Sequence, residues 1–541
     1  MAIQQLAMLF AVSSAIQKAA LASFTSNNLT HNPFPAQAAC QELQALYPAV
    51  THYPNSTGYV QDNEDFWSQA SALGPACIFT PARAEDLGHA VQILKSFSSP
   101  FAMRGGGHMP IGDFNNIDST GVLLSSSGFK QLELEGDGHS VHVGPSNHWQ
   151  DVYKYLEPEG KVVVGGRLGV VGIPGFVIGG GISFFSAQYG WASNNVKSYT
   201  VVLADGSVAK VTPENCYADL FWALRGGGNS FGLITDLELK AYDVPVVSVG
   251  IANHGNITDP SVYYGNVVDF ALYGQTADEK ASVIPVINTG NSARQSGIIS
   301  YTTYRFWSGN ISAELGNSTP ASLSYLQRPE MRILKDNFAP KTMHGWSEET
   351  APTFSKTKGL RQRFFTPLTL RVKDKARTVV ALEVIHRVYF DAIAFALSEL
   401  DVWFTGVSPF PMSARSLATS ARKINTVEGM TIPRGDPMGL KPENLIVVEF
   451  SVSYSNNGSY EPIVTDFLTN AARQIRVELS QKGLDGLIAP WLYLNDADKS
   501  QNVFGGYPED KVRALQQIRH KYDPDRVFTD LMPGGWKVAH A

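Results

Sequence analysis

Short apolar runs alternate with helix-like segments from about residue 75 onward. The run CIFTP predicts a strand that ends at a turn, with Thr80 as the N-cap and Pro81 at the first position of the next helix. The segment ARAEDLGHAVQILKSF then places its apolar residues on one face at helical spacing. The run PFAMR predicts a second strand, which ends where the glycines 105–107 begin. Because open α/β sheets bind ligands at the carboxyl ends of their strands, this loop is a candidate binding site.

Hairpins are frequent in the same half of the chain. QLELEGDGHSVHVG alternates apolar and polar residues around a Gly-Asp-Gly turn, and YTVVLADGSVAKV turns at Asp205 and Gly206, a favoured two-residue connection. NHWQDVYKYLEPEGKVVVGG reads as a helix followed by a strand, and ADLFWALRGGGNSFGLITDLELKAY as a helix, a glycine triplet and a strand. This mixture predicts an α+β fold rather than a regular βαβ repeat.

The character of the chain changes after about residue 245. Glycine becomes rarer, KARTVVALEVIHRVYFDAIAFAL has a long helical pattern, and NLIVVEFSVSYS is a pronounced strand. We therefore expect a second domain over residues 245–489, with an antiparallel sheet backed by helices. A further helix in the last segment, residues 490–541, is expected to end at Tyr522-Asp523-Pro524.

The strand NLIVVEFSVSYS carries one carboxyl group on an otherwise apolar stretch. Alternation places Glu449 on the same face as Leu445, Val447, Ser451 and Ser453, and the opposite face carries Ile446, Val448, Phe450, Val452 and Tyr454. Glu449 is thus a candidate catalytic base, although a solvent-facing or ion-paired glutamate is the commoner case. Tyr454 and His386 are no stronger candidates, and His386 on the helical pattern fits a core histidine. No base is assigned from the sequence.

Composition narrows the class of protein. The 541 residues include 44% hydrophobic residues and carry a formal charge of −6. There is no basic surplus, which argues against nucleic acid as the main partner. Charged residues make up only 17%, and 48 glycines and 30 prolines indicate many turns, a profile that suits a loop-rich secreted enzyme. No apolar run beyond the N-terminus is long enough to span a bilayer.

The N-terminal segment MAIQQLAMLFAVSSAIQKAALASF resembles a signal peptide, with an apolar stretch followed by small residues. It lacks a basic residue before that stretch, and an ordinary amphipathic helix is the alternative. We expect a signal peptide over residues 1–22 and a secreted or vesicular enzyme. Six N-glycosylation sequons agree with this route: Asn28, Asn55, Asn256, Asn310, Asn317 and Asn457.

Cysteine is scarce. In an oxidising compartment Cys40 and Cys77 would form a disulfide that ties the N-terminal segment to the first domain, with Cys216 left over. The three scattered cysteines form no metal-binding pattern, and neither H-E-x-x-H nor C-x-x-C occurs. We expect no metal.

Three glycine-rich sites lie at 105–107, 172–181 and 226–232. Backbone N–H groups in glycine loops are good ligands for a pyrophosphate. None of the sites matches G-x-G-x-x-G or the P-loop pattern, so neither standard fingerprint is present. A single triplet is more often a tight turn, but three clusters, one followed directly by His108, favour a large dinucleotide.

These motifs carry a family resemblance. MRGGGHMP, GVVGIPGFVIGGG, DLFWALRGGGNSFG and the C-terminal YLNDAD and PGGWKV resemble the vanillyl-alcohol-oxidase (PCMH-type) flavoproteins, in particular the berberine-bridge-enzyme-like branch found in fungal secondary metabolism. The resemblance implies a PCMH-type FAD-binding domain of two α+β subdomains over 40–244. It further implies that 490–541 is a berberine-bridge-like segment that returns to this domain.

The resemblance also implies the residues that hold the cofactor. The histidine of the R-[SG]-G-G-H motif is bonded to the flavin 8α-methyl carbon in that family, which makes His108 the covalent anchor. The other expected FAD-contacting residues are Arg104, Gly105, Gly106, Gly107, Gly172, Gly179, Gly180, Gly181, Tyr493 and Asn495. Bicovalent relatives have a cysteine eleven residues before the GGG, where this chain has Leu168. We therefore expect a single attachment.

The implied activity is that of an FAD-linked oxidase. Such enzymes take a hydride from an alcohol, amine or activated C–H bond and reduce O₂ to peroxide, and the natural substrate would be a secondary-metabolite intermediate. A carbohydrate oxidase of the same fold is the alternative, weakened by the missing cysteine. A flavoprotein that binds without turnover is a third reading, which the intact His108 and glycine clusters disfavour.

Overall fold

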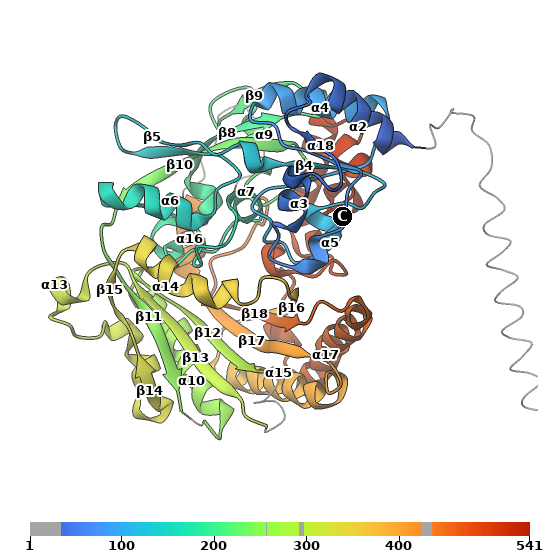
Figure 1. Ribbon diagram of the computed structural model, residues 1–541. Coiled ribbons are helices and arrows are strands. Elements are labelled where there is room, and N and C mark those ends of the chain that lie inside the picture. The colour runs from blue at the N-terminus through green and yellow to red at the C-terminus, as the bar shows by residue number, and fades with distance from the viewer. Residues whose placement is uncertain (1–33, 256, 291–296, 423–434) are drawn as a thin grey trace, which may run out of the picture.

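The computed structural model describes residues 34–541 apart from 256, 291–296 and 423–434. The expected signal peptide and the sequons at Asn28 and Asn256 lie outside these residues. The chain forms a mixed α+β structure with three sheets, two in a loop-rich half and one large sheet in the other half (Figure 1). This agrees with the predicted fold class.

The first sheet contains the two strands predicted from the apolar runs. β2 and β3 both run parallel to β4, and β1 pairs with β2 antiparallel. α2 packs on α4 beside this sheet. The bounds are α2 (Pro35–Leu46), β1 (Thr51–His52), β2 (Cys77–Phe79), α4 (Ala84–Ser96), β3 (Phe101–Arg104) and β4 (Val122–Ser125).

The helix after β2 starts later than the sequence suggested. α4 begins at Ala84 with Arg83 as its N-cap, so the prediction of Thr80 as N-cap and Pro81 as first helical residue is wrong. Thr80 instead continues the pairing of β2, because its backbone N–H donates to the Val50 carbonyl oxygen at 2.8 Å.

The second sheet contains both predicted hairpins. β5 pairs with β6, and β8 pairs with β9 through the turn at Gly206, where φ is +85°. β10 is the central strand and pairs with β6, β7 and β8, all antiparallel. The bounds are β5 (Leu132–Leu134), β6 (Ser140–Val143), α6 (Trp149–Leu156), β7 (Lys161–Val163), α7 (Ile173–Ile178), β8 (Val196–Val202), β9 (Val208–Val211), α9 (Ala218–Ala223) and β10 (Leu233–Asp243).

The third sheet has nine strands and is antiparallel throughout, as expected for the second half of the chain. Its order is β14-β11-β13-β12-β17-β18-β16-β19, with β15 paired to β11. The bounds are β11 (Val247–His254), β12 (Ala281–Thr289), β13 (Ser300–Trp307), β14 (Ile333–Asp336), β15 (Ala339–Lys341), β16 (Arg361–Arg371), β17 (Val402–Met412), β18 (Leu445–Tyr454) and β19 (Ile488–Ala489).

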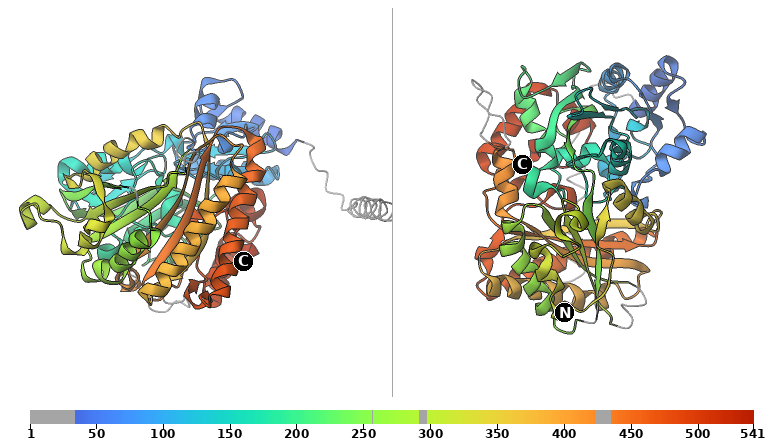
Figure 2. Two further views of the ribbon diagram at one scale, coloured as in Figure 1. Left: turned by 90° about the horizontal axis from the view of Figure 1, so that it is seen from below. Right: turned by 90° about the vertical axis from the view of Figure 1, so that its left-hand side faces the viewer.

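Helices cover the outer face of this sheet, whereas α14 (Met343–Ser355) lies on the inner side and contacts both β11 and α6 of the loop-rich half. α10 (Pro260–Asp269), α15 (Lys375–Ala396) and α17 (Glu461–Gln481) lie on the outer side, and the inner face turns toward the loop-rich half (Figure 2). The alternation of β18 follows this division. Its even-numbered residues, Ile446 to Tyr454, belong to the core under the helices, whereas Leu445 and Val447 belong to the core shared with the loop-rich half.

The chain returns to its first half at the C-terminus. α18 (Glu509–Tyr522) packs against α9, far from α17 in the sheet half (Figure 1). It ends at Tyr522, as the following Asp523-Pro524 predicted. The Asp523 carboxylate accepts hydrogen bonds from the backbone N–H groups of Val527 (2.7 Å) and Phe528 (2.9 Å), so this residue also shapes the turn that follows.

Two further predictions concern the whole chain. Cys40 and Cys77 form a disulfide between α2 and β2, and Cys216 is free and exposed, which confirms the expected pairing. In the part of the chain that the structure describes, none of the helices combines the length and the apolar character needed to cross a bilayer.

Candidate functional site

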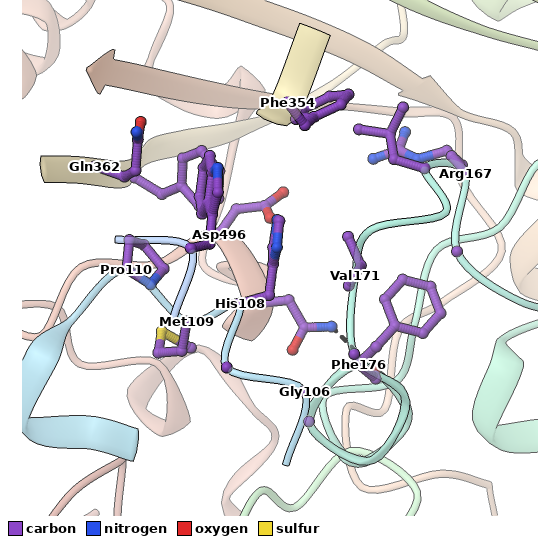
Figure 3. A pocket seen from close by; sticks show the side chains of 18 of the residues that line it. Gly106, His108, Met109, Pro110, Arg167, Val171, Phe176, Phe354, Gln362 and Asp496 are labelled. Carbon is purple, nitrogen blue, oxygen red and sulfur yellow. Dashed lines mark hydrogen bonds between the residues drawn. The ribbon is translucent and has the colours of Figure 1, made fainter. Parts of the chain in front are cut away.

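A cavity of about 740 Å³ lies between the loop-rich half and the inner face of the nine-stranded sheet. One wall consists of two segments that run side by side, the loop 105–110 and the loop 166–178, which ends in the short helix α7 (Figure 3). Side chains from the sheet form the opposite wall, and the C-terminal residues 493–496 line the cavity between them. Residues as far apart in the sequence as Trp67 and Trp536 therefore meet at one site.

The first glycine cluster leads into the cavity from the end of β3. Gly105, Gly106 and Gly107 all line it. A Cβ atom on Gly106 would lie 2.4 Å from the Cα atom of Gly172, so the two cavity loops touch through their backbones. Gly107 has φ +66°, a conformation that side chains disfavour. Glycine is therefore needed here for two reasons. The two loops touch through their backbones, and a side chain would also project into the cavity.

Arg104 supports this loop from behind and does not line the cavity. Its guanidinium donates to the carbonyl oxygens of Asp62 (2.7 Å) and Asp65 (3.1 Å) and to the Ser125 hydroxyl (2.9 Å), and it forms a buried ion pair with the Asp62 carboxylate. The buried arginine thereby fixes the carboxyl end of β3, where the loop begins.

His108 projects from the loop into the cavity (Figure 3). Burial lowers the pKa of its imidazole to about 3, and the neighbouring His148 acts in the same direction. The ring is therefore neutral at ordinary pH, and one of its nitrogens carries a free lone pair. This is the form of histidine that can act as a nucleophile.

His148 was not singled out from the sequence, yet it braces the glycine loop. Its Nε2 lies 2.9 Å from the carbonyl oxygen of Gly106, and its Nδ1 lies 3.8 Å from the Asp151 carboxylate. Burial alone would lower the pKa of His148, but the hydrogen bonds to Asp151 and to Gly106 raise it overall. The charge that His148 carries when it is protonated disfavours a proton on His108.

The second glycine cluster is divided. Gly172 lines the cavity, whereas Gly179, Gly180 and Gly181 lie behind its wall. A Cβ atom on Gly179 would lie 2.0 Å from the Asn495 side chain, and one on Gly180 would lie 2.9 Å from the Met438 side chain. In this structure these glycines give room to the chain's own side chains, and a direct contact with FAD stays a prediction for them.

Tyr493 and Asn495 both line the cavity and connect it to the loop 166–178. The Asn495 side-chain amide donates to the carbonyl oxygen of Phe176 (3.0 Å) and to the Tyr493 hydroxyl (2.9 Å). That hydroxyl also accepts a hydrogen bond from the backbone N–H of Ile182 (3.0 Å). The YLN motif thus fastens the C-terminal segment to the glycine-rich loop.

Two carboxyl groups face the cavity from different segments, Glu449 on β18 and Asp496 after the YLN motif. Burial, and then the nearby Asp496, raise the pKa of Glu449, while the Arg167 guanidinium opposes the rise. Burial also raises the pKa of Asp496, whose Oδ2 atom has no hydrogen-bond partner within the described residues. Both groups are suited to exchanging protons near neutral pH.

Of the three residues considered as a base from the sequence, the structure brings one to the cavity and two into the core under the helices. Glu449 faces the cavity, together with Ser451 and Ser453 from the same face of β18. His386 lies under the helices, hydrogen-bonded to the Tyr264 hydroxyl at 3.0 Å, and Tyr454 is bonded there to Glu461. Asp496 and Arg167 were missed, because no local pattern marks a lone charge on a loop.

The position that carries a cysteine in bicovalent relatives is Leu168, and it lines the cavity. Among the described residues Cys216 is the one free cysteine, and it is exposed outside the cavity. A thioether needs a thiol within reach, so attachment at this second position has no donor.

Comparison with known proteins identifies the class. A model of the FAD binding domain matches residues 75–212. The FAD-dependent monooxygenase prx3 of Penicillium roqueforti is 31% identical, over 93% of this chain and 94% of that protein. The bifunctional solanapyrone synthase of Alternaria solani is 29% identical, over 98% and 93% of the two chains.

The fold also matches that of solved flavoenzymes. The glucooligosaccharide oxidase of Acremonium strictum, described with a 6-S-cysteinyl, 8α-N1-histidyl FAD, is similar with a TM-score of 0.67 and 18% identity, over 90% of this chain and 97% of that one. This protein is an FAD-dependent oxidoreductase. It belongs to the family of fungal FAD-dependent enzymes that includes prx3, and its fold is that of berberine-bridge-enzyme-like proteins of known structure.

The residues of the cavity fit an FAD. The backbone of the two glycine-containing loops can approach a flat ring and a pyrophosphate closely, and the neutral His108 stands beside them. The third glycine-rich site, residues 226–232, contributes Gly228 and Asn229 to the lining of the same cavity, and the C-terminal segment contributes Trp536. The carboxyl group of Glu449 faces the cavity from the sheet wall, and that of Asp496 faces it from the C-terminal segment between the two walls.

Proposed function

We propose that this enzyme holds FAD by one covalent bond to His108 and oxidises a small-molecule alcohol, amine or activated C–H bond, with O₂ as the electron acceptor and H₂O₂ as the by-product. When bound, FAD supplies the hydride acceptor. Residues 40–244 and 490–541 would hold the cofactor, and residues 245–489 the substrate. The observation that carries the proposal is that His108, two glycine loops and Glu449 line one cavity.

The covalent link is supported by the state and place of His108. The imidazole is neutral, faces the cavity and follows a loop that can lie against a flavin. In the link, a bond between a ring nitrogen and the 8α-methyl carbon replaces one N–H and one C–H bond. The two electrons and two protons released pass to O₂ and give H₂O₂. The similar glucooligosaccharide oxidase is described with a histidyl FAD.

Glu449 is the group that we assign to proton transfer. Removal of a hydride from an alcohol or amine leaves a proton that a base must accept within hydrogen-bonding distance. Glu449 is a half-buried carboxyl group on the sheet wall, and its removal from solvent, followed by the charge of Asp496, raises its pKa toward the working range. A glutamate in this state binds the proton and releases it to Asp496 or to water.

The wall formed by the sheet favours a largely apolar substrate with rings. It carries aliphatic and aromatic side chains that present little hydrogen-bonding capacity: Ile251, Ile284, Val286, Phe364, Trp403 and Phe404. Two related fungal proteins are named an FAD-dependent monooxygenase and a solanapyrone synthase. A secondary-metabolite intermediate is therefore our first choice of substrate.

A carbohydrate substrate is the second candidate. The fold is similar to that of a glucooligosaccharide oxidase, and Asn253 and Asn288 add amide groups to the sheet wall. A sugar carries hydroxyl groups around its whole ring, and the apolar side chains of this wall cannot satisfy them, whereas Thr302, Gln362 and Ser408 on the same wall could.

We also propose that the protein passes through the secretory pathway. The disulfide between Cys40 and Cys77 is typical of an oxidising compartment. Of the sequons within the described residues, Asn55, Asn317 and Asn457 are exposed, and Asn310 is half-buried as the N-cap of a short helix. Digestion of the secreted protein with an N-glycosidase should lower its mass at these sites, and an unchanged mass would contradict the proposal.

The proposal is tested on purified protein by acid precipitation. The pellet should be yellow, and the peptide that contains His108 should carry the mass of the flavin. His108→Ala should yield a colourless pellet, because its flavin would be free to dissociate. A colourless wild-type pellet, or an unmodified His108 peptide from active enzyme, would overturn the covalent anchor. Peroxide release with terpenoid, polyketide and oligosaccharide panels would then separate the two substrate classes.

A further inference from the structure

Trp67 lies flat against the imidazole of His108. The two ring centroids are 4.3 Å apart and the ring planes differ by 6°. Both residues line the cavity, and the imidazole has no hydrogen bond to any residue that the structure describes. We propose that Trp67 is a positioning residue that holds the His108 ring in the orientation from which it bonds to FAD. This inference rests on the proposed anchor role of His108.

The indole is itself fixed between the two halves of the molecule. The backbone N–H of Trp67 donates to the carbonyl oxygen of Gly107 at 3.0 Å, directly before His108. Its ring N–H donates to the Thr357 hydroxyl at 2.9 Å, and its ring packs on Phe364 of β16 at 5.3 Å. Thr357 and Phe364 both belong to the sheet half and both line the cavity.

The backbone on either side of Trp67 is bound in the same way. The Gln69 N–H donates to the carbonyl oxygen of Leu360 at 2.9 Å, and the Gln362 N–H donates to the Ser68 hydroxyl at 3.1 Å. On the other side, buried Arg104 donates to the carbonyl oxygen of Asp65 at 3.1 Å. The segment 65–69 thus connects the glycine loop to the nine-stranded sheet, and Trp67 lies at the centre of this connection.

This arrangement bears on bond formation because a side chain without hydrogen bonds can turn about its own torsions. The ring nitrogen must face the methyl carbon for the bond to form, and a fixed orientation raises the effective concentration of the reacting atoms. The parallel stack restrains the plane of the imidazole without occupying either ring nitrogen. A hydrogen-bond donor in this place would instead occupy the lone pair that the reaction needs.

The test follows the rate at which flavin becomes acid-stable. Wild type, Trp67→Ala, Trp67→Phe and Thr357→Val are produced without flavin in riboflavin-starved cells and then incubated with FAD in air, and the acid-precipitated flavin is divided by the total bound flavin at each time. Trp67→Ala should slow the appearance of acid-stable flavin about tenfold or more while FAD still binds. Trp67→Phe keeps a ring that can stack but loses the N–H donor, and Thr357→Val removes the acceptor, so both should be slowed less.

Trp307→Phe is the matched control. Like Trp67, Trp307 is a tryptophan whose ring N–H donates to a side chain, here Asp278 at 3.0 Å, but it is buried in the core under the helices. This variant should incorporate flavin at the wild-type rate. A wild-type rate in Trp67→Ala would overturn the inference. If that variant does not fold, wild-type rates in both Trp67→Phe and Thr357→Val would overturn it.

The inference can fail independently of the proposed function. Acid-stable flavin in His108→Ala would show that the anchor lies elsewhere, and the proposed covalent link would fail. A yellow wild-type pellet, a colourless His108→Ala pellet and an unslowed Trp67→Ala would leave the anchor standing and remove the role of Trp67 alone.

Discussion

The loop wall of the cavity consists largely of backbone, whereas the opposite wall consists of side chains on a regular sheet. In the loop wall, Gly106 and Gly172 touch through their main chains, and bonds from Arg104 and His148 fix the backbone from behind. In the sheet wall, alternate residues of the strands, such as Glu449 and Ser451 on β18, point into the cavity one by one.

The difference predicts how each wall responds to mutation. A backbone surface can change only if the loop moves, so almost any added atom there disturbs the whole surface. A sheet keeps its geometry when a single exposed side chain is exchanged, because its ladder of hydrogen bonds is made by the main chain. The cofactor side should therefore tolerate little change, and the substrate side should allow specificity to vary residue by residue.

The largest effect is expected from Gly106→Ala. The new Cβ atom would lie 2.4 Å from the Gly172 Cα atom, and neither main chain can yield without moving its loop. Overpacking of this kind costs about 1–3 kcal/mol. We expect a lower Tm in thermal unfolding, and loss of acid-stable flavin and of activity.

Gly136→Ala is the control for this variant. Gly136 lies in the turn between β5 and β6, and an added Cβ atom would meet nothing within 4 Å. Its Tm and flavin content should match wild type. Wild-type flavin content in Gly106→Ala would show that the two loops can separate, and the contrast between the walls would lose its physical basis.

The next largest effect is expected from Glu449→Gln on the sheet wall. The amide keeps the shape of the side chain but cannot accept the proton, so kcat should fall about 10²- to 10⁴-fold. Flavin content and Tm should stay at the wild-type level, because the main chain of β18 is unchanged. Ser451→Ala on the same face serves as the control. Loss of flavin in Glu449→Gln would mean that the two walls are not independent.

A smaller effect on the pH profile is expected from Asp496→Asn. Burial is the main cause that raises the pKa of Glu449, and the charge of Asp496 raises it further. Because the base must be deprotonated, kcat/KM of the wild type should rise with pH through a range above that of an ordinary carboxyl group. Removing the like charge should shift this rise to lower pH.

The same shift has a consequence for stability. A raised carboxyl pKa means that the folded protein binds the Glu449 proton more tightly than the unfolded chain does. Protonation of Glu449 therefore adds to the free energy of unfolding at low pH, and this stabilisation is lost as the pH rises through the raised pKa. In Asp496→Asn this loss should be smaller, as measured by Tm against pH. A profile that is unchanged, or shifted to higher pH, would contradict the coupling of the two carboxyl groups.

Local patterns of the sequence were sufficient for the elements and for part of the site. The period of two in NLIVVEFSVSYS correctly placed Glu449 and Tyr454 on opposite faces, because alternation is a property of any strand. The start of α4 was misjudged, since the backbone pairing of Thr80 with Val50 competes with helix capping. The glycine loop and its histidine were recognised as a motif.

The remaining site residues could not be predicted because they meet only in the folded chain. Trp67 and His108 are 41 positions apart, and Glu449 and Asp496 belong to different segments. Each is an ordinary residue in its local context, and only packing brings it to the cavity. Conversely, Gly179 to Gly181 look like a cofactor loop in the sequence but accommodate Asn495, Met438 and Phe176.

The smallest effect is expected from Trp403→Ala at the outer end of the sheet wall. Trp403 lines the cavity but is 45% exposed, so a substrate could bury only part of the indole. Loss of such a partial apolar contact costs about 1 kcal/mol, which corresponds to a rise in KM of about fivefold. The value of kcat, the flavin content and Tm should be unchanged, because the variant touches neither the glycine loops nor Glu449. Steady-state kinetics on the best substrate from the peroxide panel would measure this. A fall in kcat with an unchanged KM would place the indole at the reacting centre. It would also contradict the expectation that side chains on the sheet wall can be exchanged one at a time without affecting the chemical step.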